Sequence, residues 1–443
     1  MIQLDTSLLT FDLDKLLAEN KDKLTEIQQD LEKRASDKTD WVGWLKLHED
    51  KQVFEDIQKF ADKTIASGNY DNLVVLGIGG SALGPQCLAQ ALLSPIWNEL
   101  STEERKGGLK LYFIDNVDPD WANGILQRLD LKRTLFCTIT KSGGTAETTS
   151  TFLWVIDALK KELGESWKNN LVCVTDPAKG KLRDFVNREE VKAFSVEPNV
   201  GGRFSVFSAV GMLPIALTGI KIEKFRVGVE KTYKSFSTDK AISQNNSFKL
   251  ALALMHAEQN LGKRINPLMP YSSHLARVSD WYVQLVAESL GKTPEIGPTP
   301  IKAVGATDQH SQLQLFAEGP LDKIIFFLKV ANFKDDFSIP KEPVVGFENL
   351  AGETLKRLVH AEGEGTAKAL AKAKVPSLTL TLNKVDEETV GELLYTFELM
   401  TAIAGGLYGI DPFNQPGVEL SKKYTFALLG KPGFEEYLKE IQN

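Results

Sequence analysis

The sequence predicts two doubly wound α/β domains in series, each built on a parallel sheet with helices on both faces. Its 443 residues exceed what one hydrophobic core usually organises. From Leu73 onward, short apolar runs are each followed by a glycine- or serine-rich turn and then by a helical pattern, and this alternation restarts after about Ile242. Such alternation is typical of parallel strands joined by crossover helices. The predicted units are a helical N-terminal arm at 1–50, α/β domains at 51–225 and 226–405, and a C-terminal arm at 406–443.

The elements follow from the periodicity of apolar residues. The N-terminal arm is predicted to be helical because residues such as Leu13, Leu17 and Leu24 recur at helical spacing. The stretch 204–220 carries no charge, but it is short for a membrane span and contains Pro214, so we interpret it as a buried core helix. Apolar runs predict strands at 73–76, 109–114, 135–139 and 171–174 in the first half, and at 265–269, 324–330 and 378–382 in the second.

Composition and charge exclude several classes of partner. The 52 basic and 59 acidic residues are interspersed without a long run of one sign, so we expect no nucleic-acid or membrane-binding surface. The first residues are acidic where a signal peptide needs basic ones, which predicts a cytoplasmic protein. Three widely spaced cysteines lack disulfide or zinc-ligand spacing, and we expect them to be buried and reduced: Cys87, Cys137 and Cys173.

The first chemical signal is a glycine-rich turn, Gly77-Ile-Gly-Gly-Ser-Ala-Leu-Gly84, between an expected strand and an expected helix. Glycines allow a phosphate to approach the backbone, and free amides at a helix start favour negative charge there. The alternative is a tight turn of any Rossmann-like unit. A dinucleotide site stays open as second best, although the turn departs from G-x-G-x-x-G, and the sequence has no nucleotide-binding P-loop.

The second signal is a hydroxyl-rich turn, Thr140-Lys-Ser-Gly-Gly-Thr-Ala-Glu-Thr148, which also follows an expected strand. The hydroxyls of Thr140, Ser142 and Thr145, with backbone amides, could hold a phosphate monoester. The alternative is an ordinary helix start with Thr145 and Glu147 in its opening turn. Because the carboxyl ends of parallel strands share one edge of a sheet, Ser81 of the first turn is expected nearby, which favours the phosphate interpretation.

The third signal is Arg203, which follows two glycines in the segment 199–208 and precedes the long apolar stretch. A fixed guanidinium at the edge of buried surface can stabilise an oxyanion or enediolate in a transition state. The alternative is a structural salt bridge, and the isolated segment favours that alternative.

In this order, the two turns and Val200-Gly-Gly-Arg-Phe-Ser205 resemble the glucose-6-phosphate isomerase family, and segments 281–292, 308–311 and 413–422 match its remaining blocks. The resemblance spans about residues 70–425. It implies SIS-type domains that reversibly convert D-glucose 6-phosphate to D-fructose 6-phosphate through a cis-enediol, without metal or organic cofactor. It also implies a homodimer whose only partner of another kind is the hexose 6-phosphate.

Position by position, the resemblance implies Glu288 as the base that moves the proton, four residues from Gln284 on one helix face. His310 and Lys422 would open the sugar ring, with His310 entering the neighbouring subunit's site, and Arg203 would stabilise the enediolate. Gln284 and Glu147 would touch the substrate or position its neighbours. The implied phosphate cradle comprises Gly80, Ser81, Thr140, Ser142 and Thr145.

Two departures from the family pattern are Gly144, where a hydroxyl residue is common, and Asn414, where aspartate is common. His274 lies just upstream of a matched segment and receives no role. Two rival functions stay open. A non-catalytic sugar-phosphate sensor would need the cradle but not Glu288, His310, Arg203 and Lys422 together. An NAD(P)-dependent oxidoreductase would need an acidic ribose-binding residue, and Glu99 has about the right spacing without ending a strand.

Overall fold

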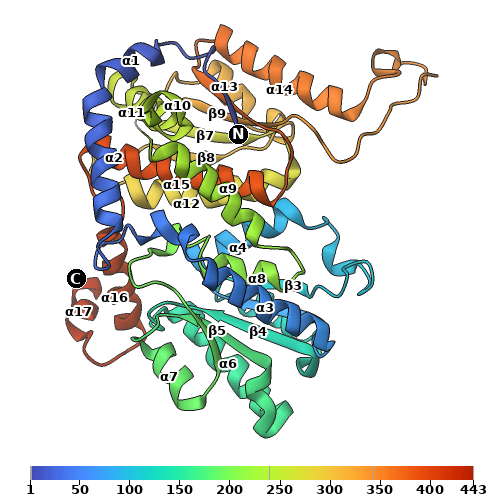
Figure 1. Cartoon of the computed structure of the whole chain (residues 1–443), viewed down its shortest axis with the longest axis vertical. Coiled ribbons are helices and arrows are strands. Elements are labelled where there is room, and N and C mark those ends of the chain that lie inside the picture. Colours follow the sequence, from blue (N-terminus) through green and yellow to red (C-terminus); the bar gives the residue numbers. More distant parts are fainter. Residues whose placement is uncertain (1, 239, 343, 443) are drawn as a thin grey trace.

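A computed structural model describes residues 2–238, 240–342 and 344–442, and it contains two five-stranded sheets (Figure 1). The first sheet has the order β3-β2-β4-β5-β6, and all its strands are parallel. The second has the order β1-β10-β9-β7-β8, with four parallel strands and an antiparallel β1 at one edge. The predicted fold class is thus confirmed.

The strands of the first sheet are β2 (Asn72–Leu76), β3 (Lys110–Ile114), β4 (Thr134–Ile139), β5 (Leu171–Thr175) and β6 (Lys192–Ser195). Those of the second are β1 (Gln3–Asp5), β7 (Ile265–Pro270), β8 (Thr299–Lys302), β9 (Ile325–Val330) and β10 (Ser377–Leu382). All seven predicted strands are confirmed. Strands β1, β6 and β8 were not predicted, because each has only three or four residues with partly exposed side chains and lacks a buried apolar run.

The helices of the first half are α1 (Leu13–Glu19), α2 (Lys21–Ala35), α3 (Lys51–Ser67), α4 (Gly80–Leu92), α5 (Pro119–Leu126), α6 (Ala146–Leu163), α7 (Lys181–Glu189) and α8 (Ala209–Ala216). Those of the second half are α9 (Glu223–Phe236), α10 (Ala241–Gln244), α11 (Asn246–Leu261), α12 (Ala276–Leu290), α13 (Leu313–Glu318), α14 (Leu355–Lys372), α15 (Glu387–Tyr408), α16 (Glu419–Leu428) and α17 (Glu435–Gln442). The stretch 204–220 is buried except near its end, as expected, and only its middle is helical.

Side chains on the two faces of each sheet enter different cores. On β2, Val74 and Leu76 pack with α5, α6 and α7 on the outer face, whereas Leu73 and Val75 point inward. The inner cluster continues without a break to Leu268 of the second sheet. A third cluster lies beyond the second sheet under α13 and α14. One core therefore joins the two α/β halves.

The N-terminal arm is largely helical, as predicted; its helices α1 and α2 pack on the second half, whereas the stretch 41–44 contacts the first. Helix α1 contacts α11, and α2 contacts α15. Strand β1 pairs with β10, and the backbone N–H of Ile2 donates to Glu392 Oε1 of α15 at 2.5 Å. The boundaries predicted at 225 and 405 fall inside α9 and α15, two helices of the inner layer.

The strand order of the first sheet determines where a ligand can bind. The chain passes from β2 outward to β3 and then returns to place β4 on the other side of β2. The helices that follow β2 and β4, α4 and α6, belong to the inner and the outer core respectively. At such a reversal the loops at the carboxyl ends of the two strands diverge and leave a crevice.

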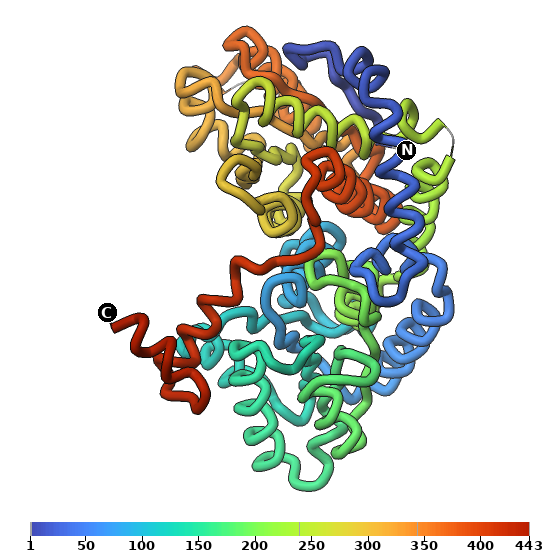
Figure 2. Tube along the Cα trace, turned by 90° about the vertical axis from the view of Figure 1, so that its left-hand side faces the viewer, coloured from blue at the N-terminus to red at the C-terminus, as the bar shows by residue number. Residues whose placement is uncertain are grey.

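The C-terminal segment leaves the second half and ends beside the first. After α15, an extended segment runs past the carboxyl edge of the first sheet, and α16 and α17 project from the body (Figure 2). Among residues 419–442, Ala427 is the only buried side chain that the structure describes. The position of α16 therefore depends mainly on the segment that leads to it.

Helices α9 and α15 approach each other so closely at two glycines that neither position has room for a side chain. A Cβ atom at Gly228 would lie 2.1 Å from the Glu388 carbonyl oxygen, and one at Gly391 would lie 2.7 Å from the Phe225 carbonyl oxygen. We predict that Gly228→Ala lowers the free energy of unfolding by about 1–3 kcal/mol, because the helices must separate. Urea unfolding followed by tryptophan fluorescence measures this. The control is Gly365→Ala in α14, where a Cβ has no neighbour within 4 Å, and equal stability of the two variants would contradict the prediction.

Candidate active site

A cleft of about 910 Å³ lies at the carboxyl ends of β2 and β4, in the predicted crevice. The glycine turn and the hydroxyl turn form one side, and α12 with the segment after α15 forms the other. The structure brings nine of the eleven predicted site residues to this cleft: Gly80, Ser81, Thr140, Ser142, Thr145, Arg203, Gln284, Glu288 and Lys422.

The glycine turn packs directly against the loop that carries Arg203. Gly79 has φ +56°, a left-handed conformation that glycine adopts without strain. A Cβ atom on Gly80 would lie 2.1 Å from the Gly202 carbonyl oxygen. Helix α4 begins at Gly80 without a side-chain cap. The Ser81 and Ala82 amides donate to the Ile78 and Gly79 carbonyl oxygens, so the groups that an anion in the cleft can use are the Gly80 amide and the Ser81 hydroxyl.

The hydroxyl turn likewise precedes a helix that begins without a side-chain cap. Thr145 is the N-cap residue of α6, but its side chain makes no capping hydrogen bond. The predicted alternative, in which Thr145 serves only to start the helix, therefore lacks its main interaction. Gly143 has φ +64°, and a Cβ there would lie 2.3 Å from the Leu182 amide nitrogen. Ser142 Oγ accepts a hydrogen bond from the Gly144 amide at 3.1 Å, which fixes the turn.

Lys141 is a cleft residue to which sequence reasoning gave no role. Its Nζ donates to the Pro198 and Val200 carbonyl oxygens at 2.5 and 3.0 Å and lies 4.3 Å from the centre of the Trp41 ring. Burial lowers the pKa of Lys141 to about 8, although Asp176 and Glu197 oppose the shift. The position of Lys141 within the hydroxyl turn could have indicated a place in the site, but sequence alone does not distinguish it from a surface lysine.

The Glu288 carboxylate is held on both oxygens. Gln284 Nε2, one helical turn earlier on α12, donates to Oε1 at 3.2 Å. Arg203 Nη1 lies 3.5 Å from Oε2. The Glu288 side chain keeps 33% of its surface exposed. Gln284 Oε1 is a buried acceptor with no partner among the residues that the structure describes, which leaves it for a donor group in the cleft.

Arg203 connects three parts of the chain, and only 2% of its side chain is exposed. Nε donates to Ser289 Oγ of α12, and Nη1 donates to Gln415 Oε1, each at 2.7 Å. Nη2 donates to the carbonyl oxygens of Pro412 and Asn414. Burial lowers the pKa of Arg203, and the nearby Glu288 carboxylate partly offsets this. The arginine is therefore both a structural tie, as the predicted alternative held, and a positive charge beside Glu288.

The C-terminal segment lines the cleft with residues between 413 and 422. Lys422 of α16 lines it, while its Nζ donates to Glu419 Oε1 at 2.7 Å. Gln415 also lines it, and sequence reasoning assigned this residue no role, although it belongs to a matched block. Asn414, the noted departure from the family pattern, contributes its backbone carbonyl oxygen to Arg203.

Two predicted residues do not line this cleft. Glu147 lies in the first turn of α6, one turn from Ser150, whose hydroxyl donates to the Glu147 carbonyl oxygen. His310 is exposed at the end of a short 3-10 helix, Thr307–His310, that follows β8. Within the chain, the arrangement thus leaves the predicted ring-opening pair incomplete.

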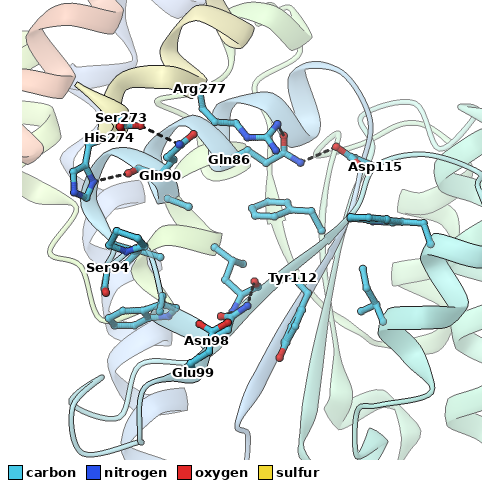
Figure 3. A pocket seen from close by; sticks show the side chains of 18 residues that line it. Gln86, Gln90, Ser94, Asn98, Glu99, Tyr112, Asp115, Ser273, His274 and Arg277 are labelled. Atoms are coloured by element: carbon cyan, nitrogen blue, oxygen red, sulfur yellow. Dashed lines mark hydrogen bonds between the residues drawn. The ribbon is translucent and has the colours of Figure 1, made fainter. Parts of the chain in front are cut away.

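His274 and Glu99 lie in a separate cleft of about 670 Å³ (Figure 3). His274 Nδ1 is 2.9 Å from the carbonyl oxygen of Gln90, near the end of α4. His274 lies just before the start of α12, whereas Glu288 lies near the end of that helix. Glu99 lines the wall beside β3 and not the glycine turn, so it does not serve the dinucleotide alternative.

Over the described residues, no helix is long and apolar enough to span a membrane.

Comparisons with known proteins agree on one family. The sequence model of the phosphoglucose isomerase family matches residues 31–437. A glucose-6-phosphate isomerase of Carboxydothermus hydrogenoformans is 42% identical over 400 residues, which are 88% of this chain and 85% of that protein. One from Thermus thermophilus is 35% identical over 430 residues, 96% of this chain and 99% of that protein.

Solved structures share the fold. The structure of a hypothetical protein from Thermus thermophilus aligns with a TM-score of 0.88 at 35% identity, covering 97% of this chain and 100% of its own. A glucose-6-phosphate isomerase from Chlamydia trachomatis aligns with a TM-score of 0.81 at 21% identity, covering 100% of this chain and 91% of its own.

The lowered pKa of Lys141 leads to a prediction for anion binding. Its ammonium carries charge below about pH 8 and loses it above, whereas an ordinary lysine stays charged to beyond pH 10. We predict that inorganic phosphate binds the cleft more weakly as the pH rises through about 8, since one nearby positive charge disappears. Calorimetric titration from pH 7 to 9.5 measures this. The step should be absent in Lys141→Met and retained in Lys63→Met, a surface control on α3, and a flat profile for the unmodified protein would contradict it.

Proposed function

The chain belongs to the phosphoglucose isomerase family, and we propose that its cleft interconverts D-glucose 6-phosphate and D-fructose 6-phosphate with Glu288 as the base. One observation carries this assignment. A carboxylate held by a buried guanidinium and an amide lies in the same cleft as two uncapped helix starts that suit a phosphate. A phosphate bound there would place the carbon chain of the sugar toward α12.

The proposed reaction begins with the phosphate in the cradle of Gly80, Ser81, Thr140, Ser142 and Thr145. Hydroxyls and amides grip the monoester without transferring it. The ring then opens: the anomeric hydroxyl loses its proton, the ring oxygen gains one, and the bond between C1 and the ring oxygen breaks. Lys422 and His310 are the proposed acid and base for this step.

Glu288 then removes the proton from C2 of the open aldose, and the C1 carbonyl becomes an enediolate oxygen. A proton then passes from O2 to O1, and return of the carbon-bound proton from Glu288 to C1, with formation of the C2 carbonyl, gives the ketose, so one carboxylate serves both carbons. Negative charge develops on oxygen during the transfer, and the fixed charge of Arg203 stabilises it without reorganisation. The unpartnered Gln284 Oε1 is suited to accept a hydrogen bond from a sugar hydroxyl, and Glu147 supports the cradle from the first turn of α6.

A homodimer is part of the proposal, because His310 does not line the cleft of its own chain. A second copy would bring its His310 to the cleft and complete the ring-opening pair. Exposed apolar side chains on the first half support an interface: Val117, Trp121 and Trp154 are 52%, 62% and 49% exposed, and Val117 and Trp154 line one surface pocket. We place the protein in the cytoplasm, where thiols such as those of the three buried cysteines stay reduced.

The sensor alternative uses the same cradle but gives no reason for a buried arginine beside a partly exposed carboxylate. Removing the carboxylate distinguishes the two. We predict that Glu288→Gln lowers kcat about 10² to 10⁴-fold, since the base acts in the transition state, and changes the binding of 6-phosphogluconate less than about tenfold. Formation of glucose 6-phosphate from fructose 6-phosphate, read through a coupled dehydrogenase, measures turnover.

The control for this variant is Glu55→Gln, an exposed glutamate on α3, which should retain full activity. Undiminished activity of Glu288→Gln would remove this residue from the mechanism. Absence of turnover in the unmodified protein, with 6-phosphogluconate still bound, would favour the sensor.

A shared site makes a quantitative prediction for mixed dimers. Glu288→Gln and His310→Ala proteins should each be nearly inactive. In a dimer with one of each subunit, one cleft carries both changes and the other carries neither. We therefore predict that dissociating and reassembling equal amounts of the two restores about a quarter of the unmodified activity, from random pairing into closed dimers. Light scattering verifies reassembly, and no recovery in verified mixed dimers would place His310 outside the partner's cleft.

A further inference from the structure

Lys292 joins the residue that carries the base to the segment that carries Lys422. It lies two residues beyond the end of α12. Its Nζ donates to the Glu288 carbonyl oxygen at 2.8 Å and also to the carbonyl oxygen of Asn414. Asn414 belongs to the extended segment between α15 and α16. The ammonium therefore connects the end of α12 to this segment. Among the hydrogen bonds that the structure describes, only those of Arg203 also connect the two.

Arg203 holds the same segment from the other side. It donates to the carbonyl oxygens of Pro412 and Asn414 and to the Gln415 side chain. Asn414 thus accepts hydrogen bonds from two cations, one anchored in the first half of the chain and one in the second. Beyond this point α16 has little buried surface of its own. Its position relative to Glu288 is therefore set by these two ties together with the buried Phe413 ring, which packs against Trp44 and Phe204.

We propose that Lys292 is a positioning residue that fixes the distance between the Glu288 carboxylate and the Lys422 ammonium. The inference rests on the proposed function, in which these two groups serve successive steps on one substrate. Glu288 is held independently by Gln284 and Arg203, whereas Lys422 depends on the tethered segment. Loss of Lys292 should therefore impair ring opening more than proton transfer.

Ring opening can be followed separately from isomerisation. An opened ring that closes again exchanges the α and β anomers of glucose 6-phosphate, and this exchange needs no proton transfer at C2. We expect Lys292→Met to slow enzyme-catalysed anomer exchange about 10-fold to 100-fold, because a small displacement of a reacting group has effects of this size. Two-dimensional exchange NMR measures the rate. Lys292→Arg keeps a cationic donor and should restore most of it.

The matched control is Lys372→Met at the exposed end of α14, which should exchange anomers at the unmodified rate. Unchanged anomer exchange in Lys292→Met would overturn the inference, even if isomerisation fell, because the residue would then act on Glu288 or on general stability.

A second measurement does not depend on activity. Loosening of the tether should expose α16 to trypsin, whose cleavage sites there include Lys422 and Lys423. We expect cleavage in α16 to be several-fold faster in Lys292→Met than in Lys372→Met, as judged by mass spectrometry. Equal rates would overturn the inference. Absence of turnover in the unmodified protein would instead refute the proposed function, while the cleavage rates would still decide whether Lys292 holds the segment.

Discussion

The arrangement of the cleft depends on one buried guanidinium. An arginine with 2% of its side chain exposed must find acceptors for its N–H groups, because unpaired buried donors are costly. Arg203 finds them on α12 and on the segment after α15, while its own loop packs against the glycine turn. One side chain of the first half thus fixes two parts of the second. Glycine is needed at position 80, because a Cβ there would lie 2.1 Å from the Gly202 carbonyl oxygen and the loops could not come this close.

Three of the cations near the cleft share a feature. Lys141, Arg203 and Lys292 each donate to backbone carbonyl oxygens, and Arg203 alone also approaches a carboxylate. Carbonyl dipoles satisfy the hydrogen bonds but do not cancel the charge. The cleft can therefore keep a positive potential while few cationic N–H groups are free to grip a ligand tightly. Such a site suits a phosphate that must be held during turnover and then released.

Much of this could be predicted from the sequence because it depends on local patterns. Buried parallel strands have the sequence pattern of apolar runs, and the turns after β2 and β4 follow directly from them, so the two turns that line the cleft could be located from these patterns alone. Strands such as β6, with lysine and serine at its ends, lack that signature. Lys141 and Gln415 take their character from residues far away in sequence, Val200 and Arg203, and periodicity does not report such contacts. The roles of His310 and Glu147 rest on the resemblance, since neither lines the cleft of its own chain.

The pairing of β1 with β10 has a consequence for how the chain is made. The hydrogen bond from Ile2 to Glu392 joins positions that are 390 residues apart. At a synthesis rate of about 5–20 residues per second, Ile2 is synthesised roughly 20–80 seconds before its acceptor. Until then β1 and the face of α2 that packs on α15 lack their partners, while α1 can pack only once α11 has been made. A segment that is translated early is thus among the last to reach its place, and a nascent chain of this protein has to be kept from aggregating for that interval.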